Sequence, residues 1–144
     1  MKMLEKFQIS NSLAGLETLR VNLARIAIAW GISEKQLFEI NFLIEEICAN
    51  SIEHTGPDAI DFIGVRLSLE KANLVITITD HGPQFDPTET IDPDVNLPVG
   101  DREAGGLGLY LVKHFADTIS YLRTDNTNTV TIEKKMKNKG WTGI

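Results

Sequence analysis

The sequence is poor in cysteine, and it has no long apolar run and no excess of positive charge. Cys48 is the only cysteine, so an intrachain disulfide is impossible, which suits a reducing compartment. No apolar run approaches the roughly 20 residues that span a bilayer, and the charged N-terminus MKMLEKFQIS does not resemble a secretory signal. The formal net charge of -6 opposes binding to phosphate backbones. We therefore expect a cytoplasmic protein that binds neither membranes nor nucleic acid directly.

The composition is that of one ordinary globular domain. The chain has 144 residues, of which 42% are hydrophobic and 24% are charged. It contains no internal repeat and no stretch with the composition of a domain linker. We expect a single domain over residues 1–144, with a frayed basic tail at 137–144.

Apolar residues at helical spacing predict two long helices in the first half of the chain. The first covers residues 12–30 and ends at Gly31. The second starts at Ser33, with Gln36 placed for a capping box, and ends near Thr55. The residues that we expect these helices to place in the core include Leu37, Ile40, Ile44, Ile47 and Cys48, with Trp30 and Phe38.

Alternating apolar residues predict strands at residues 2–9, 60–69, 74–80, 119–124 and 129–136. The second and third strands form a hairpin, with a bulge at Gly64 where the apolar phase changes. The last two form another hairpin that turns at residues 125–128, and residues 107–116 form a helix between the hairpins. This order predicts an α+β fold, a two-layer sandwich with helices on one face of a mostly antiparallel sheet.

Residues 81–105 differ from the rest of the chain. They hold four of the five prolines and show no helix or strand period. A stretch of this length without secondary structure is typical of a functional loop or of disorder.

Glu46 and Asn50 are four residues apart, so they share one face of the second predicted helix. Neither belongs to its apolar stripe, and His54 continues the same polar face. An amide oxygen suits Mg²⁺, and a carboxylate one turn away can accept a hydroxyl proton. Taken alone, the pair also fits a solvated helix face.

Asp80 ends a predicted strand and shares the face of its apolar residues. A carboxylate at the rim of an apolar face is unfavourable unless a donor satisfies it, and the amino group of adenine is such a donor. Gly82 would let the backbone approach a flat ring. The alternative is an acid that simply closes the strand at a turn.

Gly106 and Gly108 open the predicted helix at 107–116. Free amides at a helix start form an anion site, although the motif is neither a P-loop nor a Rossmann fingerprint. The alternative is a flexible hinge that ends the preceding loop.

The order of these motifs resembles the Bergerat-fold (GHKL) ATPase and kinase superfamily. Its N box resembles residues 46–50, its first glycine box residues 80–87 and its second residues 105–109. The resemblance implies an ATP lid at about 84–105, with Glu46 as catalytic base and Asn50 as ligand of Mg²⁺. The residues that it implies in contact with ATP are Asn50, His54, Asp80, Gly82, Phe85, Gly105, Gly106, Leu107, Gly108, Leu109 and Thr129. Thr129 matches the threonine that supports Asp80 at the adenine.

Three runs are similar to anti-sigma-factor serine kinases of the RsbW and SpoIIAB type: residues 50–54, 85–87 and 108–112. This similarity implies a serine/threonine protein kinase that uses ATP and Mg²⁺. Its expected partners are a sigma factor, which it sequesters, and an anti-sigma-factor antagonist of the STAS type, which it phosphorylates on serine. It also implies a homodimer.

The sequence departs from the family at two places. Gln84 stands where many relatives carry a second glycine, and Ala104 and Gly105 stand where some carry an arginine close to the phosphates. Two alternatives remain: an ATP-binding regulatory module of the same fold without phosphotransfer, and a histidine-kinase-like catalytic domain.

Overall fold

The computed structural model describes residues 2–56, 61–89 and 106–136. The elements in these segments are β1 (Lys2–Ser10), α1 (Leu13–Trp30), α2 (Glu34–Thr55), β2 (Phe62–Glu70), β3 (Asn73–Asp80), the 3₁₀ helix η1 (Pro87–Glu89), α3 (Gly106–Phe115), β4 (Thr118–Thr124) and β5 (Thr127–Lys135). The predicted tail at 137–144 and most of the predicted loop at 81–105 lie outside the described residues. None of the helices described has both the length and the hydropathy to cross a membrane.

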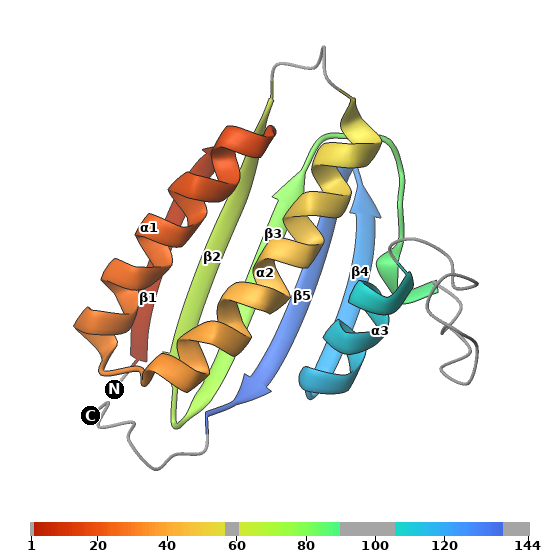
Figure 1. Cartoon of the computed structure of the whole chain (residues 1–144). Helices are drawn as coiled ribbons and strands as arrows, with labels where there is room; N and C mark the ends of the chain where they lie inside the picture. Colours follow the sequence, from red (N-terminus) through yellow and green to blue (C-terminus); the bar gives the residue numbers. More distant parts are fainter. Residues whose placement is uncertain (1, 57–60, 90–105, 137–144) are drawn as a thin grey trace.

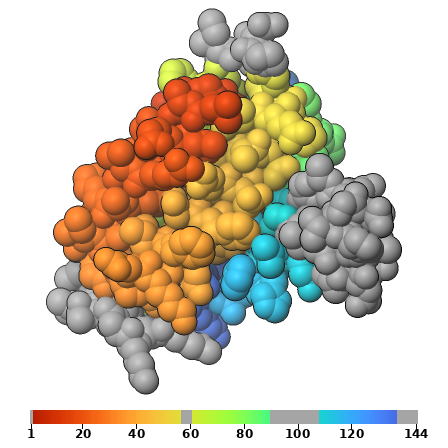
Figure 2. All heavy atoms as spheres, viewed as in Figure 1, coloured from red at the N-terminus to blue at the C-terminus, as the bar shows by residue number. Residues whose placement is uncertain are grey.

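The five strands form one antiparallel sheet in the order β1-β2-β3-β5-β4. All three α-helices lie on the same face of this sheet, with α2 between α1 and α3 (Figure 1). The space-filling view shows the same arrangement, with the side chains of α1 and α2 packed closely together (Figure 2). The predicted α+β fold is therefore confirmed, including the placement of helices on one face.

The helix ends follow the predicted signals. Gly31 ends α1 in the left-handed region, with φ at 71°. Ser33 caps α2, because its Oγ accepts a hydrogen bond from the backbone N–H of Gln36 at 3.2 Å. The helix ends at Thr55, as its sequence predicts.

The bulge predicted at Gly64 is absent. β2 pairs with β1 in unbroken register from Phe62 to Glu70, and Ile63 begins the buried series that the prediction missed. Gly64 is needed for a different reason, because a Cβ there would lie 2.5 Å from Oγ1 of Thr79 on the facing strand.

The second hairpin turns more tightly than predicted. Asp125 and Asn126 alone form the turn, both at positive φ (51° and 62°), and β5 already begins at Thr127. Such a two-residue turn matches the twist of the flanking strands. Asn128 therefore belongs to β5 and not to the turn.

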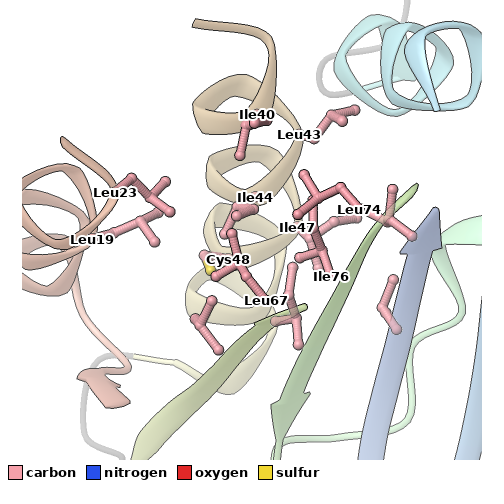
Figure 3. Close-up of a cluster of buried hydrophobic side chains, with 14 of the residues drawn as sticks. Leu19, Leu23, Ile40, Leu43, Ile44, Ile47, Cys48, Leu67, Leu74 and Ile76 are labelled. Carbon is pink, nitrogen blue, oxygen red and sulfur yellow. The ribbon is translucent and has the colours of Figure 1, made fainter. Parts of the chain in front are cut away.

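The core lies between the helices and the sheet. Apolar side chains of α1 and α2 meet those of β2 and β3 in one cluster (Figure 3). The residues labelled there are Leu19, Leu23, Ile40, Leu43, Ile44, Ile47, Cys48, Leu67, Leu74 and Ile76. Trp30 is buried, as predicted, but the prediction for Phe38 is wrong. Its side chain is 74% exposed, because it projects from the solvent side of α2.

Truncation of a side chain should destabilise the protein on the buried side of α2 but hardly affect it on the exposed side. Ile44→Ala removes a fully buried side chain, so we expect the free energy of unfolding to fall by roughly 2–5 kcal/mol. Phe38→Ala is the control, with an expected change within about 0.5 kcal/mol because the ring is exposed. Urea unfolding of both variants measures the difference, and equal losses would contradict this assignment of core and surface.

Candidate functional site

A small pocket opens between the second half of α2, the end of β3 and the start of β5. Its lining consists of Ile47, Asn50, Ser51, His54, Thr55, Asp80, Pro83, Phe85, Pro87, Asn128 and Val130. Four residues predicted from separate motifs therefore share one pocket: Asn50, His54, Asp80 and Phe85.

The wall that α2 contributes is ordered by two contacts. The Asn50 amide nitrogen donates to the carbonyl oxygen of Glu46 at 2.7 Å, which leaves its Oδ1 as the atom available to a ligand. The His54 ring stacks on Phe85, with 4.1 Å between the centroids and 24° between the planes. This stacking joins α2 to the segment that follows β3.

Glu46 lies against the first turn of α3. A Cβ on Gly108 would come within 2.2 Å of Oε2 of Glu46, so a larger residue there would displace the carboxylate from this place. Burial raises the pKa of the Glu46 carboxyl, and the negative charge of Glu45 raises it further. The structure thus sets a carboxylate of increased basicity beside helix-start amides that lack acceptors within the helix.

Asp80 is 9% exposed and faces the core side of the sheet, as its strand phase predicts. Its Oδ1 accepts from the backbone N–H of Gly82 and from the side-chain amide of Asn128, each at 2.9 Å. Within the described part of the chain, no donor bonds to Oδ2. That oxygen is the acceptor that a ligand can use.

Gly82 is required by its neighbours. A Cβ there would lie 2.5 Å from Oγ1 of Thr55 and 3.2 Å from Oδ1 of Asp80. The glycine therefore keeps the turn after β3 close to both α2 and the carboxylate. A larger residue would push these groups apart.

The expected support of Asp80 by Thr129 is wrong. Asn128 is the residue directly opposite Asp80, whereas Thr129 is opposite Thr79. Because successive side chains of a strand point to opposite faces, Thr129 lies on the other side of the sheet from the Asp80 carboxylate. Sequence reasoning missed Asn128 because it assigned this residue to a turn.

The second glycine motif is described only in part. Gly105, and with it Ala104 and residues 90–105 of the predicted lid, lie outside the described residues. Gly106 and Leu107 form the start of α3, as predicted within one residue. Leu109 is 4% exposed and packs in the core, so its side chain is directed away from any ligand, and only its backbone could contact one. Gln84 is exposed.

The described residues hold no group of three or more histidine, cysteine or acidic side chains that could bind a metal. A metal at this pocket would therefore take most of its ligands from a bound molecule and from water. Mg²⁺ is commonly held in this way, with one or two protein ligands.

Comparison with known families identifies the family to which the chain belongs. Residues 9–134 match the model of the histidine kinase-like ATPase domain. The chain belongs to this family, which confirms the superfamily that its motifs resemble.

Curated relatives within this family are protein kinases. A serine/threonine-protein kinase, BtrW of Bordetella bronchiseptica, is 29% identical over 111 residues, which cover 76% of this chain and 78% of the relative. The serine-protein kinase RsbW of Bacillus cereus is 28% identical over 120 residues, covering 81% and 74%. RsbW of Bacillus mycoides is 27% identical over 141 residues, covering 92% and 88%. These relatives support the predicted enzyme class.

A solved structure shares the fold. The structure of the RsbU and RsbW domains of a Mycobacterium tuberculosis protein matches with a TM-score of 0.68 at 14% identity. The match covers 96% of this chain and 34% of that protein. At this identity the likeness concerns the fold alone.

Cys48 lies on the core side of α2, where its thiol is fully buried. Burial raises its pKa from 9.0 to about 12, and the negative charges of Asp80 and Glu45 add to the shift. The thiol is therefore a packed neutral group, as its helical phase predicts. Because the pKa is higher in the folded state, the unfolded chain loses this proton first as the pH rises.

The buried thiol predicts a loss of stability in alkali that Cys48→Ala should remove. Between pH 9.0 and about 12 the wild type should lose roughly 1.4 kcal/mol per pH unit relative to the variant. Below that window the difference between the two proteins should be constant, since the thiol is protonated in both states. Urea unfolding across this pH range measures it, and parallel curves up to pH 11 would show that the thiol titrates normally.

Proposed function

We propose that this protein is an ATP-dependent serine-protein kinase acting as an anti-sigma factor. The contact that carries the proposal is that of Glu46 with Gly108, because it sets a basic carboxylate beside the helix start where phosphates would bind. Names of the relatives BtrW and RsbW support a serine or threonine as acceptor.

Adenine would bind at Asp80. Its amino group would donate to Oδ2, the carboxylate oxygen that takes no bond from the described residues. The turn at Gly82, whose N–H bonds to Asp80, would bring the backbone against the ring. Phe85 and His54, stacked on one another, form the neighbouring wall.

The phosphates would lie over the first turn of α3, where the amides of Gly106 and Gly108 point toward an anion. Asn50 would supply the protein ligand for Mg²⁺ through Oδ1, because its nitrogen is bonded to Glu46. Bound Mg²⁺ would neutralise charge on the phosphates, and ATP would supply the phosphoryl group.

Glu46 would accept the proton of the attacking serine hydroxyl. The serine oxygen bonds to the γ-phosphorus as the bond to the β-phosphate oxygen breaks and ADP leaves. The raised pKa of Glu46 suits a general base, since proton transfer improves as the base approaches the working pH. Positioning by α2 and α3 supplies most of the remaining effect.

The partners follow from the resemblance to RsbW. We propose that the substrate is a STAS-type anti-sigma-factor antagonist, that the second partner is a sigma factor, and that the active unit is a homodimer in the cytoplasm. The reduced, buried thiol of Cys48 fits that compartment.

Glu46→Gln tests the proposed base. It keeps the size of the side chain but cannot accept a proton, so phosphate transfer from ATP to the antagonist serine should fall at least about 100-fold. Binding of Mg-ATP should remain within a fewfold of wild type. Transfer is measured by mass spectrometry of the antagonist, and binding by calorimetry.

Glu53→Gln is the matched control for that experiment, because Glu53 is an exposed carboxylate further along the same helix. It should transfer phosphate like the wild type. Transfer at the wild-type rate by Glu46→Gln would exclude Glu46 as the base. Tight ATP binding by the wild type without any transfer would favour a regulatory module.

Asn50→Ala tests the metal ligand. Loss of one charge-assisted contact should weaken binding of ATP about 10- to 100-fold in the presence of Mg²⁺. Binding in EDTA should hardly change, since Asn50 would act through the metal. Calorimetric titrations under both conditions separate the two cases, and equal losses with and without Mg²⁺ would argue that Asn50 only shapes the pocket.

A further inference from the structure

Two side chains of β4 reach toward the site without lining its pocket. Tyr121 and Arg123 both bond to Asn128, which in turn bonds to Asp80. We propose that Tyr121 and Arg123 are positioning residues that hold Asp80 in the orientation required to select a base with an amino group. This inference rests on the proposed recognition of adenine by Asp80.

Asn128 is the centre of this network and is 4% exposed. Its Oδ1 accepts from the Tyr121 hydroxyl at 2.5 Å and from Nη1 of Arg123 at 3.1 Å. Its Nδ2 donates to Oδ1 of Asp80 and to the carbonyl of Pro83, both at 2.9 Å. All the polar atoms of the amide are therefore engaged.

These partners allow only one orientation of the Asn128 amide. A guanidinium can only donate and a backbone carbonyl can only accept. Rotating the amide by half a turn would set its oxygen against the Asp80 carboxylate and its nitrogen against Arg123. The donors on β4, together with the carbonyl of Pro83, thus determine that a donor, and not an acceptor, faces Asp80.

Arg123 has a second role at the turn after β3. Its Nη1 donates to the carbonyl of Gly82 at 2.7 Å, while the backbone N–H of Gly82 donates to Asp80. Both ends of Gly82 are therefore held, one by the carboxylate and one by β4. Loss of the guanidinium would remove one bond from the turn and one from Asn128.

The consequence concerns which atom of Asp80 is presented. Two donors occupy Oδ1, so Oδ2 is left as an acceptor at the pocket. An acceptor in that place binds the 6-amino group of adenine. It repels the 6-oxo group of hypoxanthine, and two acceptors left unpaired in a buried site lower the affinity strongly. If Asp80 could rotate, this discrimination would weaken while the phosphate contacts on α3 stayed the same.

The test compares binding of ATP and ITP, which differ in the base by an amino and an oxo group, to the full chain with Mg²⁺. In Arg123→Met we expect affinity for ATP to fall about tenfold and affinity for ITP to change less than threefold. The ratio of the two dissociation constants is decisive, because a general loss of structure would weaken both nucleotides alike. An unchanged ratio in a variant that still binds ATP would overturn the proposal.

Tyr121→Phe is the second variant and removes a single oxygen atom, so it retains the packing of the strand. It should lower the ATP to ITP preference by a smaller factor, since Arg123 still bonds to Asn128. Arg66→Met, an exposed arginine on β2, is the control and should leave the preference unchanged. A wild type that binds both nucleotides equally would refute the role of Asp80 itself. A wild type that prefers ATP, with both β4 variants unaltered, would refute only the positioning role.

Discussion

The burial of one side of α2 against the centre of the sheet is the constraint on which the site depends. Ile40, Ile44 and Ile47 lie in the core and set the rotation of the helix about its axis. That rotation carries Glu46 and Asn50 to the side that faces β3 and α3. The positions proposed for the catalytic base and the metal ligand are therefore a geometric consequence of hydrophobic packing, which supplies the rigid support that a precise site needs.

Close approach at two glycines then brings separate elements onto this helix. Gly82 brings the turn after β3 against Thr55, and Gly108 brings α3 against Glu46. In both places a Cβ would overlap an oxygen of α2. Neither glycine has a positive φ, so the reason for glycine here is the absence of a side chain and not the backbone conformation.

In Asn50 and Asp80, hydrogen bonds within the protein engage one polar atom of the side chain and leave another as an acceptor for a ligand. The nitrogen of Asn50 bonds to its own helix, which frees an oxygen, and Oδ1 of Asp80 is shared by two donors, which frees the other. Buried polar networks of this kind stabilise one orientation, because any alternative leaves groups unpaired at a cost of about 1–3 kcal/mol each. The same bonds thus contribute to folding and to specificity.

Local signals in the sequence allowed much of this to be predicted. Ser33 with Gln36 marked the start of α2, and strand alternation placed Asp80 on the core face, since both depend on residues a few positions apart. The wrong predictions concern residues whose environment depends on contacts with residues distant in the sequence. The sequence predicts a bulge at Gly64, which instead makes room for Thr79 on the facing strand. It also predicts Phe38 in the core, whereas this residue lies on the solvent side of α2.

The sequence by itself determined the family, the order of the elements and the identity of Glu46, Asn50 and Asp80 as candidates, because these follow from periodicity and motif spacing. Only the tertiary structure decided which residue supports Asp80. The turn at Asp125 and Asn126 is two residues long, so the register places Asn128 rather than Thr129 opposite the carboxylate. A shift of one residue in the register of a strand moves every side chain to the opposite face of the sheet. The register is determined by pairing between strands far apart in the chain.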